Sequence, residues 1–484
     1  MIPFRVIPQH DGPDGCPTAT SFIQEKTEKE LKEAYDSVPK PLILQRMRHF
    51  QWLKVLLFQG LPARYKSQDA SQPWLMFWII NSFQLMGVQL DVATKQRAID
   101  TLMQCQSPDG GFGGGPKQAP GLLPTYAAVS TLACVGHPGP GGGWDQIDRQ
   151  KMYAWFMSLK QPDGSFLVSR NAEIDVRAIY SLLVTATLLD MMTPELVAGT
   201  ASFIASTQTY EGGFASTSAP YYISVDTLMD EPRPALGEAH GGYAGCAIAS
   251  WVLLKPFMTE EESKKLNVDK FLRWLVWMQG EQADYGGFRG RSNKLVDNCY
   301  SWWCGESLAI VESILDLQEE TGHEDEFIED EGDDEWVDTD WWLYNNKALQ
   351  EYILGLGQDN AGGLRDKPSK RADVYHTFYS LAGFSTAQHR VYQSKSLQGS
   401  LRNKWKPSEA FTPSTAKGED DRRQATRKEL WINARSWKED ESSHRYVGSP
   451  NNRVNAIHPV FTLLISQASN IMDHFYGQTS PPKS

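Results

Sequence analysis

The sequence predicts an all-α protein, an α/α barrel in which helix–turn–helix units close into a ring. A glycine-containing turn recurs along the chain with helical patterns around it, whereas strand-like alternation is scarce. The turns read QSPDGGFGGG (106–115), QPDGSF (161–166), TYEGGF (209–214), DYGGFRG (284–290) and NAGGL (360–364). Two layers of helices bury both sets of apolar faces when they close into a ring. An open α-solenoid of similar units is the alternative architecture.

Each turn leads into a stretch whose apolar residues recur at i, i+3 and i+4 or run almost continuously, which is typical of buried helices. These stretches read PTYAAVSTLACV (124–135), DVRAIYSLLVTATLL (175–189), GGYAGCAIASWVLL (241–254), CYSWWCGESLAIVESILDL (299–317) and VYHTFYSLAGF (374–384). Further helical patterns at 149–160 and 268–279 separate the units. We therefore expect one barrel domain over residues 1–484, with an acidic insertion at about 318–341 and a polar insertion at about 389–450, both as surface excursions.

Charge and cysteine content narrow the class of protein. The net charge is −12, and the stretch 319–340 alone holds 13 acids without a lysine or arginine, as solvated loops do. The rest is nearly neutral, so no nucleic-acid partner is expected. Six cysteines in 484 residues fit a reducing compartment. The sequence shows no signal peptide and no transmembrane segment, and a cytoplasmic location is expected.

Polar or aromatic residues occupy equivalent positions near the start of the predicted inner helices. They are Tyr126, Arg177, Tyr243, Tyr300 and His376. Leucine or alanine would serve packing equally well, so these helix ends are expected to face a common cavity. Helix N-termini carry partial positive charge and free N–H groups, and such a cavity suits an anion.

Asp297, Cys299 and His376 form a candidate zinc site. A carboxylate, a thiolate and an imidazole are accepted zinc ligands, and three protein ligands leave the fourth position open, as catalytic zinc requires. The alternative is an N-capping aspartate, a buried structural cysteine and a core histidine.

A candidate diphosphate site surrounds these residues. Arg291, Lys294, Tyr300 and His240 provide two fixed cations, a phenol and an imidazole, although the two cations could equally be solvated. Aromatic residues share these helices. An apolar pocket beside the diphosphate-binding residues would accept an isoprenoid diphosphate. The aromatic residues, which in helical proteins are more often core, are Trp74, Trp78, Tyr126, Tyr180, Tyr243, Trp302, Trp303, Tyr375 and Tyr379.

The chain resembles the beta subunits of protein farnesyltransferases. The resemblance rests on SPDGGFGGGP, PTYAAV, DVR, EAHGGY, GRSNKLVDNCYSWW and DKPSKRADVYH, and it covers roughly 40–390 plus NAIHPVF at 455–461. GGF alone is shared by all protein prenyltransferases and loosely by terpene cyclases, but NKLVDNCYSWW followed by DVYH is highly specific. The family's fold is the same α/α barrel.

The resemblance implies roles for individual residues. Zinc would be held by Asp297, Cys299 and His376. The head of farnesyl diphosphate, the prenyl donor, would be bound by His240, Arg291, Lys294 and Tyr300, and its tail would lie along Arg177, Gly242, Tyr243, Cys246 and Trp303. Gly241 is also expected to bind the donor. Asp366 matches a magnesium-linked aspartate, with Lys370 nearby. The acceptor site would be lined by Trp74, Trp78, Tyr126, Tyr375 and Tyr379, of which Trp74 and Tyr126 would also limit prenyl length.

The family also implies partners and an activity. Its members work as obligate heterodimers with a helical alpha subunit and farnesylate the cysteine thiol of C-terminal CaaX proteins such as small GTPases. This chain departs from the usual pattern at Gly121 and Leu123, which leaves the preferred X residue open, and at Ala372, where an arginine is common.

Three other functions compete with this interpretation. A geranylgeranyltransferase beta subunit shares the chemistry, but Trp74 and Asp366 argue against it. A terpene cyclase shares the barrel, but its DxDD and DDxxD motifs do not occur. A non-catalytic helical-repeat scaffold would make the zinc residues a coincidence, and a lack of bound zinc would favour it.

Overall fold

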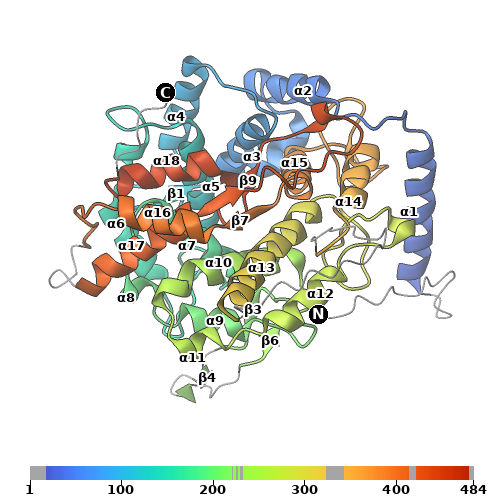
Figure 1. Cartoon of the computed structure of the whole chain (residues 1–484). Coiled ribbons are helices and arrows are strands. Elements are labelled where there is room, and N and C mark those ends of the chain that lie inside the picture. The colour runs from blue at the N-terminus through green and yellow to red at the C-terminus, as the bar shows by residue number, and fades with distance from the viewer. Residues whose placement is uncertain are drawn as a thin grey trace.

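Six helices form a closed ring at the centre of the molecule (Figure 1). In this computed structural model, residues 18–220, 222–224, 227–228, 233–322, 343–413 and 421–478 are described. Each inner helix contacts the next, and the last contacts the first. The inner helices are α3 (Gln72–Leu85), α5 (Leu122–Val135), α7 (Val176–Leu188), α10 (Gly241–Leu254), α13 (Tyr300–Gly322) and α15 (Val374–Gln388). The closed ring confirms the α/α barrel and excludes the open solenoid.

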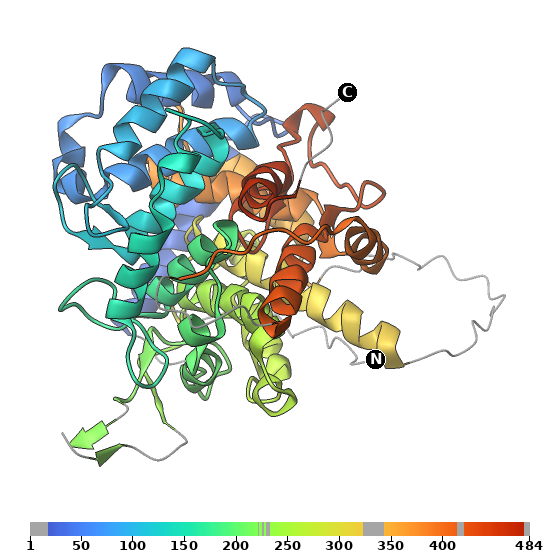
Figure 2. The same cartoon turned by 90° about the vertical axis from the view of Figure 1, so that its left-hand side faces the viewer.

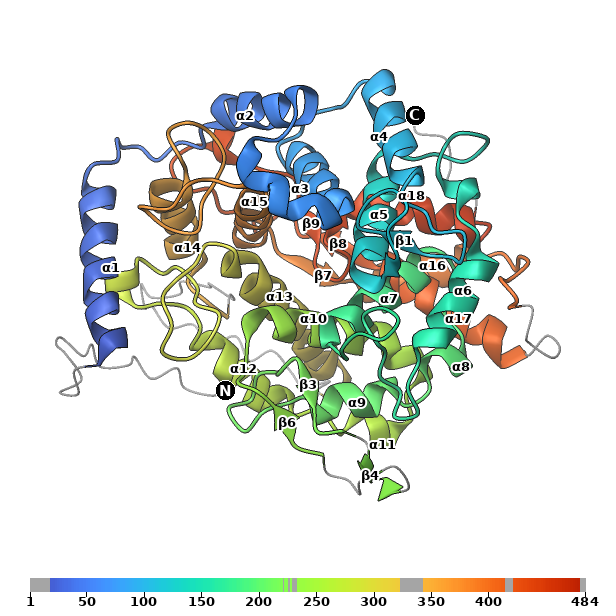
Figure 3. The same cartoon turned by 180° about the vertical axis from the view of Figure 1, so that it is seen from behind.

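A second set of helices covers the outside of the ring (Figure 3). The outer layer comprises α2 (Arg46–Gln59), α4 (Val92–Met103), α6 (Arg149–Leu159), α9 (Thr200–Ser206), α12 (Val268–Val276) and α14 (Asn346–Tyr352). Three further helices, α1 (Ala19–Asp36), α8 (Pro194–Val197) and α11 (Glu260–Ser263), lie at the periphery. The strands form antiparallel pairs of two: β1 (Phe112–Gly113) with β2 (Pro120–Gly121), β3 (Thr217–Ser218) with β6 (Ala235–Leu236), β4 (Tyr222–Ser224) with β5 (Thr227–Leu228), β7 (Val391–Gln393) with β8 (Trp437–Glu439), and β9 (Ile457–His458) with β10 (Leu463–Leu464).

Backbone hydrogen bonds bring the starts of the inner helices to one rim. The first N–H groups of an inner helix would otherwise lack partners. At or just before the start of five of the six inner helices, one backbone N–H donates to the turn that precedes the next inner helix. The bonds are Gln72 to Gly114, Leu122 to Val168, Val176 to Ser216, Gly241 to Gly290 and Asn298 to Asp366, all between 2.8 and 2.9 Å. The repeat therefore places every helix start, and the polar residues there, around one opening.

The glycines of the turns are required by space as well as by backbone conformation. Gly110 and Gly212 have φ values of 102° and 106°, which favour glycine. A Cβ on Gly110 would lie 2.6 Å from the backbone of Lys151, and one on Gly212 would lie 2.2 Å from that of Lys270. Both neighbours belong to outer helices, so the glycines let each turn dock closely on the outer layer.

The C-terminal segment closes the other end of the barrel. Asn455 donates its N–H to the carbonyl of Leu85, the last residue of α3. Tyr126 and Tyr180 donate their hydroxyls to the backbone oxygens of Phe461 and Val460 at 3.3 and 3.1 Å. Helix α18 (Ile465–Phe475) then packs on α5 and α7. Among the described residues, the C-terminal segment therefore covers the end of the barrel opposite the rim of helix starts.

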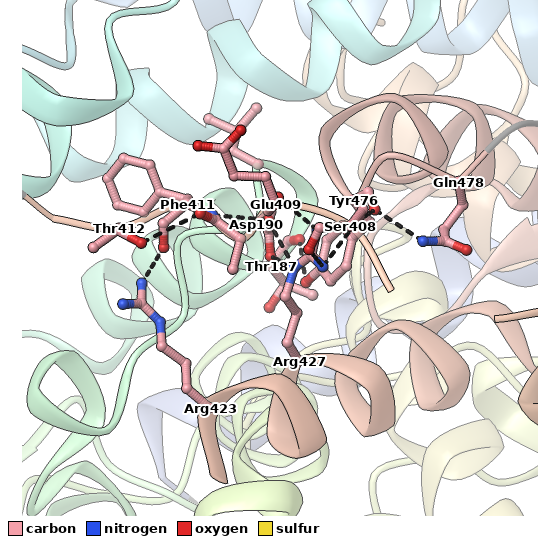
Figure 4. A network of polar contacts seen from close by, with 12 residues as sticks. Thr187, Asp190, Ser408, Glu409, Phe411, Thr412, Arg423, Arg427, Tyr476 and Gln478 are labelled. Carbon is pink, nitrogen blue, oxygen red and sulfur yellow. Dashed lines mark hydrogen bonds and ion pairs between the residues drawn. The ribbon is translucent and has the colours of Figure 1, made fainter. Parts of the chain in front are cut away.

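The expectation that residues 389–450 are a surface excursion is wrong. Strands β7 and β8 pair with each other, and α16 (Lys395–Lys404) and α17 (Asp421–Arg435) pack beside α18 (Figure 2). Arg427 on α17 is 4% exposed and pairs at 2.8 Å with Asp190, which is equally buried (Figure 4). Trp431 and Trp437 are also buried. The polar composition of this segment does not indicate exposure, because some of its charged side chains are paired inside the protein.

Most of the predicted acidic insertion, residues 323–342, lies outside the described residues. Among the residues that are described, no helix combines the length and the apolar character needed to cross a bilayer.

Candidate active site

Asp297, Cys299 and His376 meet on the rim, between the neighbouring helices α13 and α15. One ligand atom from each side chain lies within 4.8 Å of the other two, and His376 Nε2 is 3.2 Å from Asp297 Oδ1. The Cys299 N–H donates to the same Asp297 oxygen at 2.9 Å, which fixes the carboxylate. Nitrogen, oxygen and sulfur donors converging from three residues fit Zn²⁺ with one position left open.

Asp373 orients the histidine of this group and was missed in the sequence. As the N-cap of α15 it accepts the His376 N–H at 2.8 Å and contacts His376 Nδ1 at 2.6 Å, so Nε2 faces Asp297. Carboxylate–histidine–metal arrangements use this pairing to fix the ring. Burial lowers the pKa of His376, but hydrogen bonds to Asp297 and Asp373 outweigh it and raise the pKa to about 10. The cluster is thus rich in negative charge that a cation would neutralise.

A neutral imidazole and a phenol lie next to the zinc residues. His240 caps α10 by accepting the Gly242 N–H on Nδ1 at 3.0 Å, and its Nε2 lies 3.0 Å from the Tyr300 hydroxyl. Burial and Arg291 lower the pKa of His240 to about 4, so the ring is neutral at physiological pH. With Nδ1 accepting, Nε2 carries the hydrogen and donates outward. A Cβ on Gly290 would lie 2.0 Å from the Tyr300 ring, so this glycine makes room for the phenol.

Two predicted cations lie on the loop that leads to Asp297. Arg291 pairs with Glu238, and Lys294 is exposed. The first residue of α10, Gly241, is buried beside Tyr300. Three predicted head-group residues, His240, Tyr300 and Arg291, therefore lie together at the rim, with Glu238 as a competing anion. Lys294 lies three positions beyond Arg291 on the same loop.

Aromatic side chains continue from this cluster into the barrel. The Tyr243 ring lies 4.7 Å from the His240 ring, and the Arg177 guanidinium lies 5.4 Å from the Tyr243 ring. Asp175 holds Arg177 through hydrogen bonds to both carboxylate oxygens. Cys246 is buried further along α10.

An aromatic wall is formed by rings that pack against one another. Trp303 donates its Nε1–H to the Tyr375 hydroxyl at 3.2 Å and lies 4.6 Å from the Tyr379 ring. Trp74 lies 5.5 Å from both Trp78 and Tyr126. These predicted residues are neighbours in space although they come from four helices.

A pocket of about 360 Å³ opens beside the zinc residues. Three predicted residues line it, namely Trp78, Tyr375 and His376, but Trp74, Tyr126 and Tyr379 do not. Tyr126 is only 2% exposed and belongs to the barrel interior. The remaining lining residues were not anticipated: Arg64, Tyr65, Gln68, Leu75, Asp373 and Val374. Of these, Asp373 had a readable signal, an aspartate in the N-cap position before an apolar run.

Asp366 lies on the turn next to the zinc residues and pairs with Lys367. Burial raises the pKa of Asp366, and the Asp297 carboxylate raises it further. A second cation near Asp366 would relieve this repulsion, and hard cations such as Mg²⁺ prefer carboxylate oxygen.

Glu306 is a buried carboxyl that the sequence analysis did not single out. It lies on α13 with 2% of its surface exposed, and burial raises its pKa well above the ordinary value of 4.5. Gly245 on α10 leaves room for it, since a Cβ there would lie 2.1 Å from Glu306 Oε1.

Comparison with known proteins gives a consistent picture. Residues 44–463 match the Prenyltransferase alpha-alpha toroid domain family. The protein farnesyltransferase subunit beta of Pisum sativum is 36% identical over 394 residues, covering 72% of this chain and 87% of the relative. That of Schizosaccharomyces pombe is 35% identical, covering 76% and 84%.

Geranylgeranyl transferases are more distant. The type-1 subunit beta of Arabidopsis thaliana is 25% identical, covering 72% of this chain and 86% of the relative. A solved structure of Candida albicans protein geranylgeranyltransferase-I in complex with GGPP aligns with a TM-score of 0.57 at 19% identity, covering 89% of this chain and 99% of that one. This structural likeness supports the barrel fold alone.

Proposed function

We propose, because the chain belongs to the family of protein farnesyltransferase beta subunits, that it farnesylates C-terminal CaaX proteins, such as small GTPases, together with an alpha subunit. Membership in this family sets aside the terpene cyclase and the scaffold. The whole chain would act as one barrel domain in the cytoplasm, where farnesyl diphosphate is the donor.

The observation that carries the proposal is the convergence of Asp297, Cys299 and His376 on one point of the rim. Bound zinc would lower the pKa of an acceptor thiol at its open position, so that a thiolate exists at neutral pH. Asp373 holds the His376 ring so that Nε2 faces the other two ligands. Burial raises the pKa of the Cys299 thiol well above its usual range, which argues against a free nucleophilic thiolate at this position. As a ligand, Cys299 would be a thiolate only with zinc bound.

The cationic side of the rim suits the departing diphosphate. In the reaction, the acceptor sulfur forms a bond to C1 of the farnesyl group, and the C1–O bond breaks with its electron pair going to the diphosphate. The His240 Nε2–H, the Tyr300 hydroxyl, Arg291 and Lys294 supply donors and positive charge for that oxygen. Arg291 must release Glu238 to take part. Asp366 would hold Mg²⁺ against the same diphosphate.

The aromatic wall would receive the prenyl chain, and the neighbouring pocket would receive the acceptor peptide. Tyr243, Trp303 and Cys246 continue inward from the head-group cluster, as a farnesyl tail requires. Trp78 and Tyr375 line the pocket beside His376, within reach of a peptide whose cysteine approaches the zinc residues.

A transfer assay with matched cysteine variants tests this proposal. The chain would be co-purified with an alpha subunit and assayed for farnesyl transfer to a fluorescent peptide ending in a CaaX sequence. Cys299→Ala should abolish transfer and lower zinc content. Cys304→Ala, which removes a buried thiol five positions further along, on α13, should leave both nearly unchanged. Equal activity of the two variants would exclude the proposed ligand role of Cys299.

A further inference from the structure

A second group of metal-binding side chains lies at the other end of α15. His389 caps the C-terminal end of this helix, Glu439 ends β8, and His444 follows on the next loop. One ligand atom from each lies within 4.8 Å of the others. None of these residues belongs to the site on the rim. All three lie in the segment 389–450, with His389 at its first position, where α15 of the barrel ends.

Backbone contacts hold the three side chains together. The pairing of Val391 with Glu439 in the β7–β8 sheet places the carboxylate beside the helix end. The loop is then fixed on both sides of His444, because Asp440 donates its N–H to the Arg390 carbonyl at 2.8 Å and Arg445 donates to the Gln388 carbonyl at 3.3 Å. Strand pairing and backbone hydrogen bonds therefore fix the positions of the three residues relative to one another.

The hydrogen bonding of His389 fixes which ring nitrogen can bind a ligand. Its side chain is fully buried, and Nε2 lies 2.7 Å from the carbonyl oxygen of Val454, which only an N–H can satisfy. In the neutral ring Nδ1 then carries a lone pair, and this atom faces Glu439. An imidazole anchored through one nitrogen to a backbone carbonyl is the usual arrangement of a metal-binding histidine.

The contacts to Glu439 differ from ordinary hydrogen bonds. His389 Nδ1 and His444 Nε2 lie 2.9 and 2.7 Å from the same oxygen, Glu439 Oε1. Yet neither nitrogen has an aligned hydrogen-bond partner among the residues that the structure describes. Arg453 also approaches this oxygen, at 3.3 Å. Two ring nitrogens thus lie at contact distance from one carboxylate oxygen without the alignment of ordinary N–H···O bonds.

We propose that His389, Glu439 and His444 form a second metal site, which takes a divalent transition-metal ion of the zinc class and ties the segment 389–450 to the barrel. Imidazole ligands favour such ions over Mg²⁺ or Ca²⁺. Ligand bonds of about 2.0–2.2 Å separate ligand atoms by about 3.3 Å in a tetrahedral site. The contacts to Glu439 need to lengthen by only about half an ångström to admit the ion.

The test measures metal content in a chain whose rim site is disabled. The variant Cys299→Ala/His376→Ala, co-purified with the alpha subunit and dialysed after zinc loading, should retain one zinc per chain by mass spectrometry. Adding His444→Ala, or Glu439→Gln, which preserves the side-chain shape, should remove it. Adding His137→Ala, which removes an exposed loop histidine, should not. Cobalt loading should give d–d absorption without a thiolate-to-metal band, because this ligand set has no sulfur.

Retention of the zinc after His444→Ala and Glu439→Gln would overturn the proposal. So would a rim-disabled chain that binds no zinc while its circular dichroism and its association with the alpha subunit match the unmodified chain. In that case the three side chains form only an ion-pair cluster.

Discussion

Replacing Arg427 by methionine should destabilise the protein far more than a typical loss of one ion pair. Arg427 Nε lies 2.8 and 2.9 Å from the two Asp190 oxygens, and its Nη1 donates to the backbone and the hydroxyl of Ser408 (Figure 4). Both charged side chains are 4% exposed. Removing one partner of such a buried pair leaves an uncompensated charge and costs about 3–5 kcal/mol. Methionine keeps an apolar side chain against Trp405 and Tyr476, so the substitution removes the guanidinium charge while preserving most of the packing.

The cost should depend on pH in a defined direction. Burial raises the pKa of Asp190 from 3.8 to about 6 even with Arg427 present. Without the guanidinium the folded-state pKa rises further, whereas the unfolded value stays near 3.8. A raised carboxyl pKa contributes stability at low pH that is lost as the pH rises through the folded-state value. The deficit of Arg427→Met relative to the unmodified chain should therefore be small at pH 5 and large at pH 8.

Chemical denaturation of the purified complex at these two pH values measures the effect. A matched control is Arg402→Met, because Arg402 pairs with Glu429 at 2.9 Å in the same segment but is 48% exposed; its loss should cost only about 0–1 kcal/mol. Adding Asp190→Asn should rescue Arg427→Met, since asparagine tolerates the φ of 58° at this position. A cost equal to that of Arg402→Met, or a deficit independent of pH, would refute the reasoning.

Three further predictions concern the site and the barrel. Trp74→Thr should remove one ring of the aromatic wall and shift the ratio of kcat/KM for C20 over C15 diphosphate by about 10- to 100-fold toward the longer donor; an unchanged ratio would mean that Trp74 does not limit chain length. Asp373→Asn should weaken zinc binding by about 10- to 100-fold in competition with a chelator, because the His376 ring loses its carboxylate partner; wild-type affinity would contradict the orienting role. Glu306→Gln should raise the melting temperature, more at pH 8 than at pH 5. Burial raises the folded-state pKa of Glu306 well above its ordinary value of 4.5. As the pH rises from 4.5 toward the folded-state pKa, folding of the unmodified chain loses about 1.4 kcal/mol per pH unit. A gain in melting temperature that is independent of pH would show that Glu306 does not fold as a neutral acid.

The barrel was predictable because the same pattern, a glycine-containing turn followed by an apolar helix, recurs along the chain. Each turn carries a glycine where the chain passes close to an outer helix, and each following helix is apolar on nearly every side. The convergence of the three candidate zinc ligands was predictable because Asp297 and Cys299 are two positions apart and His376 occupies the equivalent position one repeat later. Local patterns repeated along the chain were therefore sufficient for the fold and for bringing these three side chains together; their role as metal ligands stays a prediction.

Contacts between distant, chemically ordinary residues were not predictable. The pair of Arg427 with Asp190 spans 237 positions, and a polar segment with scattered charges reads as solvated until its partners are known. The same holds for Tyr65, whose hydroxyl accepts the Val374 N–H at 3.3 Å and so places a helical turn beside the zinc residues. Nothing in the local sequence of either residue indicates its partner.

Single-turnover prenyl transfer by the chain and its alpha subunit tests the central claim most directly. Enzyme preloaded with C15 or C20 diphosphate would be mixed with peptides ending in Ser, Met or Leu, and the thioether product would be followed in time. The account predicts faster C15 transfer that disappears in Cys299→Ala. Preferential C20 transfer would contradict the farnesyl assignment, and C15 transfer that survives Cys299→Ala would contradict the zinc site.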